Sequence, residues 1–254
     1  MTAHSVWSWP RLIAHRGGGR LAPENTLAAM RTGHAWGYQM VEYDVKLSED
    51  GVLFLLHDDR IDRTSSGTGL ASELSWKALA EHDFGAWYDA GFAGEPAPTL
   101  SAVARYTQAQ GIHSNIEIKP TTGHEHQTGL AVAAAARTLW AQAALPPLLS
   151  SFSEVALEAA RTAAPDLPRA LLIEGPVPTD WRVRQLGLGC MGVNIDATYA
   201  EPAVIQEILG QGATLAIWTV NDVAQARQLL QSGCHAIFTD QLAQIRPADF
   251  GQTP

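Results

Sequence analysis

Short apolar runs alternate with stretches of helical periodicity along most of the chain. An alternation of this kind is typical of an α/β fold in which helices join parallel strands. Eight of the runs are predicted strands, and eight parallel strands are the number that closes a TIM (β/α)8 barrel. The predicted strands lie at residues 12–14, 40–45, 115–118, 148–151, 170–173, 191–195, 215–220 and 236–239.

Capping residues and composition place helices between these strands. Asn25 or Thr26 can cap the helix that follows the first strand, and Ser153 can cap a helix over residues 154–163. An alanine-rich stretch predicts a longer helix over residues 128–144. Each predicted strand is therefore separated from the next by enough chain for a helical crossover.

One apolar run, at residues 52–57, does not fit this alternation. It follows the second strand after only four residues, whereas a parallel neighbour needs a crossover of about a dozen residues or more. We therefore expect this run to fold back antiparallel on the second strand. Pairing Ser48 with Val52 would place His57 opposite Tyr43.

The length and composition of the chain favour a single domain. Its 254 residues, 46% of them hydrophobic, suit one large barrel. We expect residues 1–254 to form one domain, with an insertion after the second strand over approximately residues 46–98. Barrel loops of that length usually carry function, so the insertion is expected on the catalytic face. Cys190 and Cys234 are too few for a disulfide framework.

The charge of the chain argues against one class of partner. The formal net charge is -9 and no run is rich in Lys and Arg, so nucleic-acid binding is not expected. The first 17 residues lack the features of a signal peptide, and no apolar run reaches the roughly 20 residues of a membrane span. We expect a cytoplasmic protein without stable membrane insertion. The sequence leaves the oligomeric state open, and a homo-oligomer is one possibility.

Polar residues gather at the carboxyl ends of the predicted strands, and active sites of TIM barrels lie there. They are densest in the first three strand–helix units. The carboxyl ends of parallel strands meet at one face, so these side chains should lie close together. The residues at strand ends are His15, Arg16, Glu42, Asp44, His57, Asp58, Glu117, Lys119, Asn194, Asp196, Trp218, Asn221 and Asp240.

Three of these residues are carboxylates that predict a metal site. Glu42 and Asp44 are two residues apart on one strand and face the same side, and Glu117 lies at the end of the adjacent strand. Three carboxylates in one barrel mouth would repel each other unless a cation held them together. A ligand set of oxygens suits Mg²⁺ or Ca²⁺ better than Zn²⁺. The alternative is that the carboxylates bind no metal and pair with basic side chains, namely Lys46, Lys119 or Arg16.

Two histidines and two cationic residues accompany the carboxylates. His15 and His57 are placed for proton transfer, and cleavage of a phosphodiester needs a base for the attacking oxygen and an acid for the leaving alkoxide. Arg16 and Lys119 would bind phosphate oxygens and stabilise charge in the transition state. These groups are of the kinds that cleavage of a phosphodiester needs.

Seven short motifs, in order and at matching strand ends, resemble those of the bacterial glycerophosphodiester phosphodiesterases. The likeness runs from about residue 11 to residue 246, nearly the whole chain. Tyr43 stands where that family usually has a small apolar residue, and it should point away from the site. The motifs are AHRG (14–17), PENT (23–26), VEYDV (41–45), DG followed by HD (50–51 and 57–58), EIK (117–119), WTVN (218–221) and FTD (238–240).

The resemblance implies a fold, a reaction and a role for each site residue. It implies a TIM barrel with an inserted segment, His15 and His57 as the acid–base pair, and a metal held by three carboxylates, namely Glu42, Asp44 and Glu117. It implies that Arg16 and Lys119 contact phosphate, and we expect Trp218 to contact the substrate. The substrate would be a deacylated phospholipid, a glycerophosphodiester, hydrolysed to sn-glycerol 3-phosphate and an alcohol. Attack by the glycerol 2-hydroxyl through a cyclic phosphate and direct attack by water both stay open.

Other readings compete with this one. A phosphodiesterase of the same superfamily could act on intact lipids, but neither a secretion signal nor an obvious apolar docking patch supports that reading. An amidohydrolase typically opens with His-x-His, whereas Arg16 and Gly17 follow His15 here. A glycosidase would need two carboxylates but not the two histidines and two cations. A binding protein without activity would be expected to have lost part of the constellation, which is complete.

Overall fold

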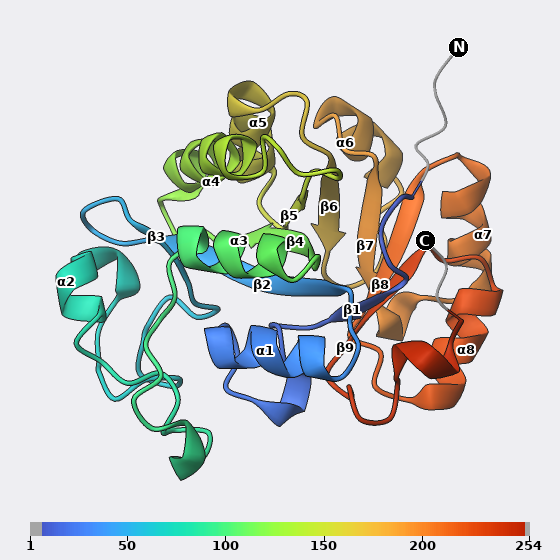
Figure 1. Ribbon diagram of the computed structural model, residues 1–254. Helices are drawn as coiled ribbons and strands as arrows, with labels where there is room; N and C mark the ends of the chain where they lie inside the picture. Colours follow the sequence, from blue (N-terminus) through green and yellow to red (C-terminus); the bar gives the residue numbers. More distant parts are fainter. Residues whose placement is uncertain (1–6, 252–254) are drawn as a thin grey trace.

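The computed structural model describes residues 7–251, and eight parallel strands form a closed barrel at its centre (Figure 1). These strands are β1 (Leu12–Ala14), β2 (Met40–Leu47), β4 (His113–Ile118), β5 (Leu148–Ser151), β6 (Arg169–Ile173), β7 (Gly192–Asp196), β8 (Thr214–Trp218) and β9 (Ala236–Thr239). The first strand pairs with β9 on one side, and Ala14 pairs with Val41 of β2 on the other, which closes the barrel. The predicted TIM barrel is confirmed.

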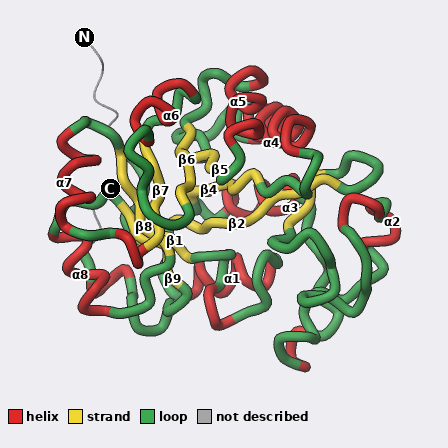
Figure 2. The backbone as a smooth tube through the Cα atoms, turned by 180° about the vertical axis from the view of Figure 1, so that it is seen from behind, coloured by secondary structure: helices red, strands yellow, loops and turns green. Residues whose placement is uncertain are grey.

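Helices surround the barrel, as both views of the backbone show (Figures 1 and 2). Thr26 caps the first of them, because its Oγ accepts the backbone N–H of Ala29, so the capping residue there is Thr26 and not Asn25. The helix predicted over residues 128–144 begins earlier and ends earlier. Its chain leaves the helix where Trp140 is buried in the core. The helices are α1 (Leu27–Ala35), α2 (Trp76–Leu79), α3 (Leu100–Ala109), α4 (Glu125–Leu139), α5 (Glu154–Ala163), α6 (Trp181–Gly187), α7 (Pro202–Gly210) and α8 (Val223–Gln231).

Alternation of side chains along β2 separates an apolar shell from the barrel interior. Val41, Tyr43 and Val45 belong to the large hydrophobic core between strands and helices, so Tyr43 points away from the site as predicted. The residues between them face inward, because successive side chains of a strand point to opposite faces. Met40 belongs to a smaller apolar cluster that fills the barrel below the polar residues. That cluster comprises Trp9, Ile13, Met40, Leu148, Ala170, Ala216, Ala236 and Phe238.

A hairpin extends the barrel sheet after β2. The strand β3 (Leu53–Leu55) pairs antiparallel with β2, and Lys46 lies opposite Phe54. The backbone N–H of Ser48 donates to the carbonyl of Val52 at 3.0 Å, which is the predicted register. The segment that follows lies to one side of the barrel, together with α2 (Figures 1 and 2). It has a small core of its own, formed by Phe54, Leu56, Ile61, Ala71, Leu79, Phe84 and Ala97.

The insertion after the second strand is thus confirmed, while its exact limits at residues 46–98 stay a prediction. The assignment of residues 1–254 to one domain also stays a prediction, and residues 1–6 and 252–254 lie outside the described part of the chain. Among the described residues, no helix has the length and apolar character needed to cross a membrane.

Candidate active site

A cavity of about 450 Å³ opens at the carboxyl ends of the barrel strands. All eight residues predicted for the site line this one cavity. They reach it from five strands or the residues that follow them, so the closed barrel is what brings them together. The eight are His15, Arg16, Glu42, Asp44, His57, Glu117, Lys119 and Trp218.

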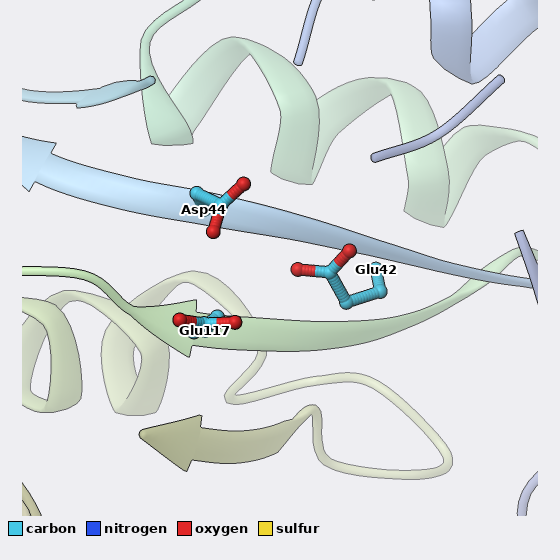
Figure 3. A group of neighbouring side chains, drawn as sticks. All are labelled: Glu42, Asp44 and Glu117. Carbon is cyan, nitrogen blue, oxygen red and sulfur yellow. The ribbon is translucent and has the colours of Figure 1, made fainter. Parts of the chain in front are cut away.

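Three buried carboxylates that line this cavity lie together on two neighbouring strands (Figure 3). Asp44 on β2 is in register with Glu117 on β4, and Glu42 precedes Asp44 on the same face. One oxygen atom from each carboxylate lies within 4.8 Å of the other two. This spacing would let a single cation contact all three side chains.

Burial and mutual repulsion disfavour ionisation of two of the three carboxylates. Burial raises the pKa of Glu42 well above its ordinary value, and the charges of Asp44 and Glu117 add to this effect. The pKa of Glu117 rises to about 7 for the same reasons. Burial would also raise the pKa of Asp44, but Lys119, His57 and Arg16 outweigh it and hold that pKa below its ordinary value.

Basic side chains compensate this charge only in part. The Lys119 Nζ lies 2.7 Å from Oε1 of Glu117 and 3.7 Å from Oδ1 of Asp44. The Nζ of Lys46 instead contacts Asp59 and the carbonyl oxygen of Lys119, so it is not a partner of the three carboxylates. Among the described residues, Oε1 of Glu42 is buried and accepts no hydrogen bond. An unpartnered carboxylate oxygen of this kind fits a hard cation as its ligand.

Local backbone geometry aims Arg16 at the same carboxylates. Its φ of 51° is in the left-handed region, and its backbone N–H donates to Oε2 of Glu42 at 2.9 Å. Asn25 has a similar conformation, and its side-chain amide donates to Oδ2 of Asp44 and accepts the backbone N–H of that residue. The sequence offers Asn25 as a helix cap, whereas the structure gives it a role in orienting Asp44.

Each of the two histidines is hydrogen-bonded through Nδ1 to an aspartate. The Nδ1 of His15 lies 2.7 Å from Oδ1 of Asp240. The other oxygen of Asp240, Oδ2, accepts a hydrogen bond from the side-chain amide of Asn221. The Nδ1 of His57 lies 2.7 Å from Oδ1 of Asp58. Burial lowers the pKa of His57, although the charge of Asp44 opposes this shift. The Nε2 of His15 lies 3.9 Å from Oε2 of Glu42, which is beyond hydrogen-bond distance. At both rings Nε2 is the nitrogen that the aspartate does not use, and it can exchange a proton with a bound molecule.

The sequence places Asp58, Asn221 and Asp240 at strand ends but indicates no role for their side chains in the site. The motifs HD, WTVN and FTD contain them, and this was the available signal. Glu24 was missed in the same way, within PENT, and its Oε1 accepts a bond from Arg16 at 2.7 Å. These residues contact other site residues and do not line the cavity. Asp58 directly follows its partner His57, whereas the partners of the other three lie 8 or more positions away, where no spacing in the sequence indicates the contact.

An aromatic wall faces the charged half of the cavity. The rings of Phe152 and Trp218 meet edge to face with centroids 5.4 Å apart. The Nζ of Lys119 lies 5.1 Å from the centre of the Phe152 ring. The cavity therefore offers an apolar surface beside cations and carboxylates, which suits a small molecule with both charged and carbon-bearing parts.

Comparisons with known proteins agree with this geometry. Residues 15–244 match the model of the glycerophosphoryl diester phosphodiesterase family. The protein YhdW of Bacillus subtilis is 32% identical over 232 residues, which cover 90% of this chain and 93% of the relative. A glycerophosphodiester phosphodiesterase of Caldanaerobacter subterraneus is 28% identical over 231 residues, with 90% and 93% covered.

A solved structure extends the likeness to the fold of the whole barrel. A phosphodiesterase of Oleispira antarctica, determined in complex with the product sn-glycerol-3-phosphate, has a TM-score of 0.89 and 32% sequence identity. The match covers 96% of this chain and 98% of the Oleispira chain. The sequence match from residue 15 to residue 244 spans every strand-end residue of the cavity. The chain belongs to the glycerophosphoryl diester phosphodiesterase family.

Proposed function

We propose that this protein hydrolyses glycerophosphodiesters, the deacylated phospholipids, to sn-glycerol 3-phosphate and an alcohol. One observation carries the proposal: three carboxylates, two histidines and two cations line a single cavity in a chain of this family. A phosphodiester needs all three kinds of group, because its cleavage involves charge at phosphorus and two proton transfers. The Oleispira phosphodiesterase, which binds sn-glycerol-3-phosphate as its product, supports this substrate class.

A divalent cation, Mg²⁺ or Ca²⁺, would be held by Glu42, Asp44 and Glu117. The unpartnered Oε1 of Glu42 and the 4.8 Å spacing of the three ligand oxygens support this assignment. A bound cation supplies positive charge that keeps the carboxylates ionised and polarises a phosphoryl oxygen. The pKa values of Glu42 and Glu117 should then fall back toward their ordinary range.

The two histidines would transfer the protons. His15 and His57 each use Nδ1 for an aspartate, so Nε2 of one ring can accept the proton of the attacking oxygen. The Nε2 of the other ring can donate a proton to the leaving alkoxide. Each ring is held in one orientation by its aspartate, which reduces the reorganisation that the reaction requires.

The remaining predicted residues would bind the substrate. Arg16 and Lys119 are cations on the cavity wall and would contact the non-bridging phosphate oxygens. Trp218, with Phe152 beside it, would cover a carbon-bearing part of the substrate. A small molecule is thus the expected partner.

Release of glycerol 3-phosphate from glycerophosphocholine and glycerophosphoethanolamine tests the proposal. We expect release with Mg²⁺ or Ca²⁺, loss of release with excess EDTA, and loss in His15→Ala by a factor of about 10² or more. His126→Ala is the matched control, because His126 is exposed on α4 and does not line the cavity. A folded protein that releases no product with either ion would overturn the proposal.

A further inference from the structure

Arg63 joins two separate parts of the molecule through paired hydrogen bonds. It lies in the inserted segment, on the loop between β3 and α2. Its Nε and Nη2 donate to the two oxygens of Asp58 at 2.6 and 3.1 Å. Its Nη1 and Nη2 donate to the two oxygens of Glu24 at 2.8 Å each. Both edges of one guanidinium are therefore occupied by carboxylates.

Each of these carboxylates also holds a residue of the cavity. Oε1 of Glu24 lies 2.7 Å from Nη1 of Arg16, and Oδ1 of Asp58 lies 2.7 Å from Nδ1 of His57. Five side chains thus form an unbroken series, with Arg63 at its centre and a cavity residue at each end. Arg16 and Glu24 come from the loop between β1 and α1, whereas the other three come from the inserted segment.

We infer that Arg63 is a positioning residue that fixes the phosphate-binding Arg16 and the proton-transferring His57 relative to each other. This inference rests on the proposed function. Arg63 does not line the cavity, so it acts through Glu24 and Asp58 and not on the substrate. It also sets the inserted segment against the barrel mouth, where the two ends of the series must meet one phosphate group.

Only an arginine can fill this position. The guanidinium is planar and offers donors along two edges, whereas a lysine ammonium is a point charge that cannot form two bidentate pairs. The side chain of Arg63 is 45% exposed, and exposed ion pairs contribute little to stability. The effect of losing Arg63 should therefore appear in catalysis more than in unfolding.

Arg63→Lys and Arg63→Ala test the inference by steady-state kinetics on glycerophosphocholine. We expect kcat/KM to fall roughly 10- to 100-fold in both variants, with a rise in KM from the loss of order at Arg16 and a fall in kcat from the loss of order at His57. Guanidinium at millimolar concentration should restore activity to Arg63→Ala, and sodium chloride at equal ionic strength should not. Arg60→Ala is the matched control, because Arg60 lies on the same loop. Within the described residues, Arg60 forms an ion pair only with the exposed Asp62.

The side-chain ¹⁵N resonances of His57 give a readout that needs no activity. Removal of Arg63 should change the tautomer population of the His57 ring in Arg63→Lys but not in Arg60→Ala, even if the wild-type protein hydrolyses no glycerophosphodiester. An inactive wild type would thus count against the proposed function alone. Unchanged kinetics and unchanged His57 resonances in a folded Arg63→Lys protein would overturn the positioning role, and so would equal losses in Arg60→Ala.

Discussion

At the scale of single residues, each of the two histidines of the cavity is oriented by a hydrogen bond to an aspartate. One aspartate is distant from its histidine in the sequence and the other is adjacent to it, but both are equally close in space. Asp240 follows His15 by 225 positions, whereas Asp58 directly follows His57, and both aspartates lie 2.7 Å from Nδ1 of their ring. Asp240 is further fixed by Asn221, which donates to its Oδ2 and accepts its backbone N–H. A carboxylate held on both sides restricts the ring more than a mobile one would.

Asp240→Asn is expected to lower kcat by about 10- to 100-fold and to change KM little, since Asp240 orients His15 and does not line the cavity. Steady-state kinetics measures both constants. Asp196→Asn is the control, because Asp196 also stands at the end of a strand, β7. Its side chain accepts the backbone N–H of Thr198 and does not contact His15 or His57. Equal values of kcat in wild type and Asp240→Asn would contradict the orienting role.

At the scale of elements, the helix α1 packs closely on the loop that carries Arg16. A Cβ atom added at Gly33 would lie 2.2 Å from the carbonyl oxygen of Gly17. Gly33 is inside the helix, where alanine normally stabilises by about 1 kcal/mol relative to glycine. Here the close approach of backbone outweighs that preference, so the glycine sets how near the helix comes to the loop.

Gly33→Ala should therefore destabilise the protein by roughly 1–3 kcal/mol, because the helix must move away from the loop. It should also lower kcat/KM, since Arg16 and the loop move with it. Denaturant unfolding and kinetics measure the two effects. Gly210→Ala at the end of α7 is the matched control, with nothing within 4 Å of an added Cβ, and it should be neutral or slightly stabilising. A Gly33→Ala variant more stable than wild type would refute the close-packing argument.

The elements were more predictable from the sequence than the contacts between them. The sequence predicts the strands because buried parallel strands are continuous apolar runs. It predicts the hairpin register because a short connection between two strands allows few pairings. The end of α4 was misplaced because burial of Trp140 overrode the helical preference of the alanines that follow. The pairing of Arg63 with Glu24 could not be predicted, because Glu24 lies 39 positions away and only the folded chain brings the two together.

At the scale of the whole molecule, ionisation of two of the three carboxylates, Glu42 and Glu117, opposes folding when no cation is present. The folded pKa of Glu117 is about 7 and that of Glu42 is also raised, and both exceed the ordinary value of 4.5. Each group therefore stabilises the folded state below about pH 4.5 and loses that contribution as the pH rises through its folded pKa. The cytoplasmic location stays a prediction, and the oligomeric state stays open.

In excess EDTA, Glu42→Gln is expected to be more stable than wild type at pH 8 and equally stable at pH 4.5, because the raised pKa of Glu42 costs stability only where the side chain ionises. Urea unfolding at the two pH values measures the difference. Mg²⁺ or Ca²⁺ at about 100 times its Kd should raise the stability of wild type by about 2.7 kcal/mol and that of the variant by less. A stability difference that is independent of pH, or wild-type stability unaffected by either ion, would count against the metal site.

The bond between His15 and Asp240 also has a consequence for biosynthesis. His15 is synthesised before its partner Asp240, which follows 225 positions later, and this separation corresponds to roughly 10–45 s at ordinary translation rates. The nascent barrel stays open for that interval, with β2 as the one available neighbour of β1. A nascent chain that lacks β9 therefore lacks both the partner of His15 and the strand that closes the barrel, so the orientation of His15 and the closure of the barrel arise together.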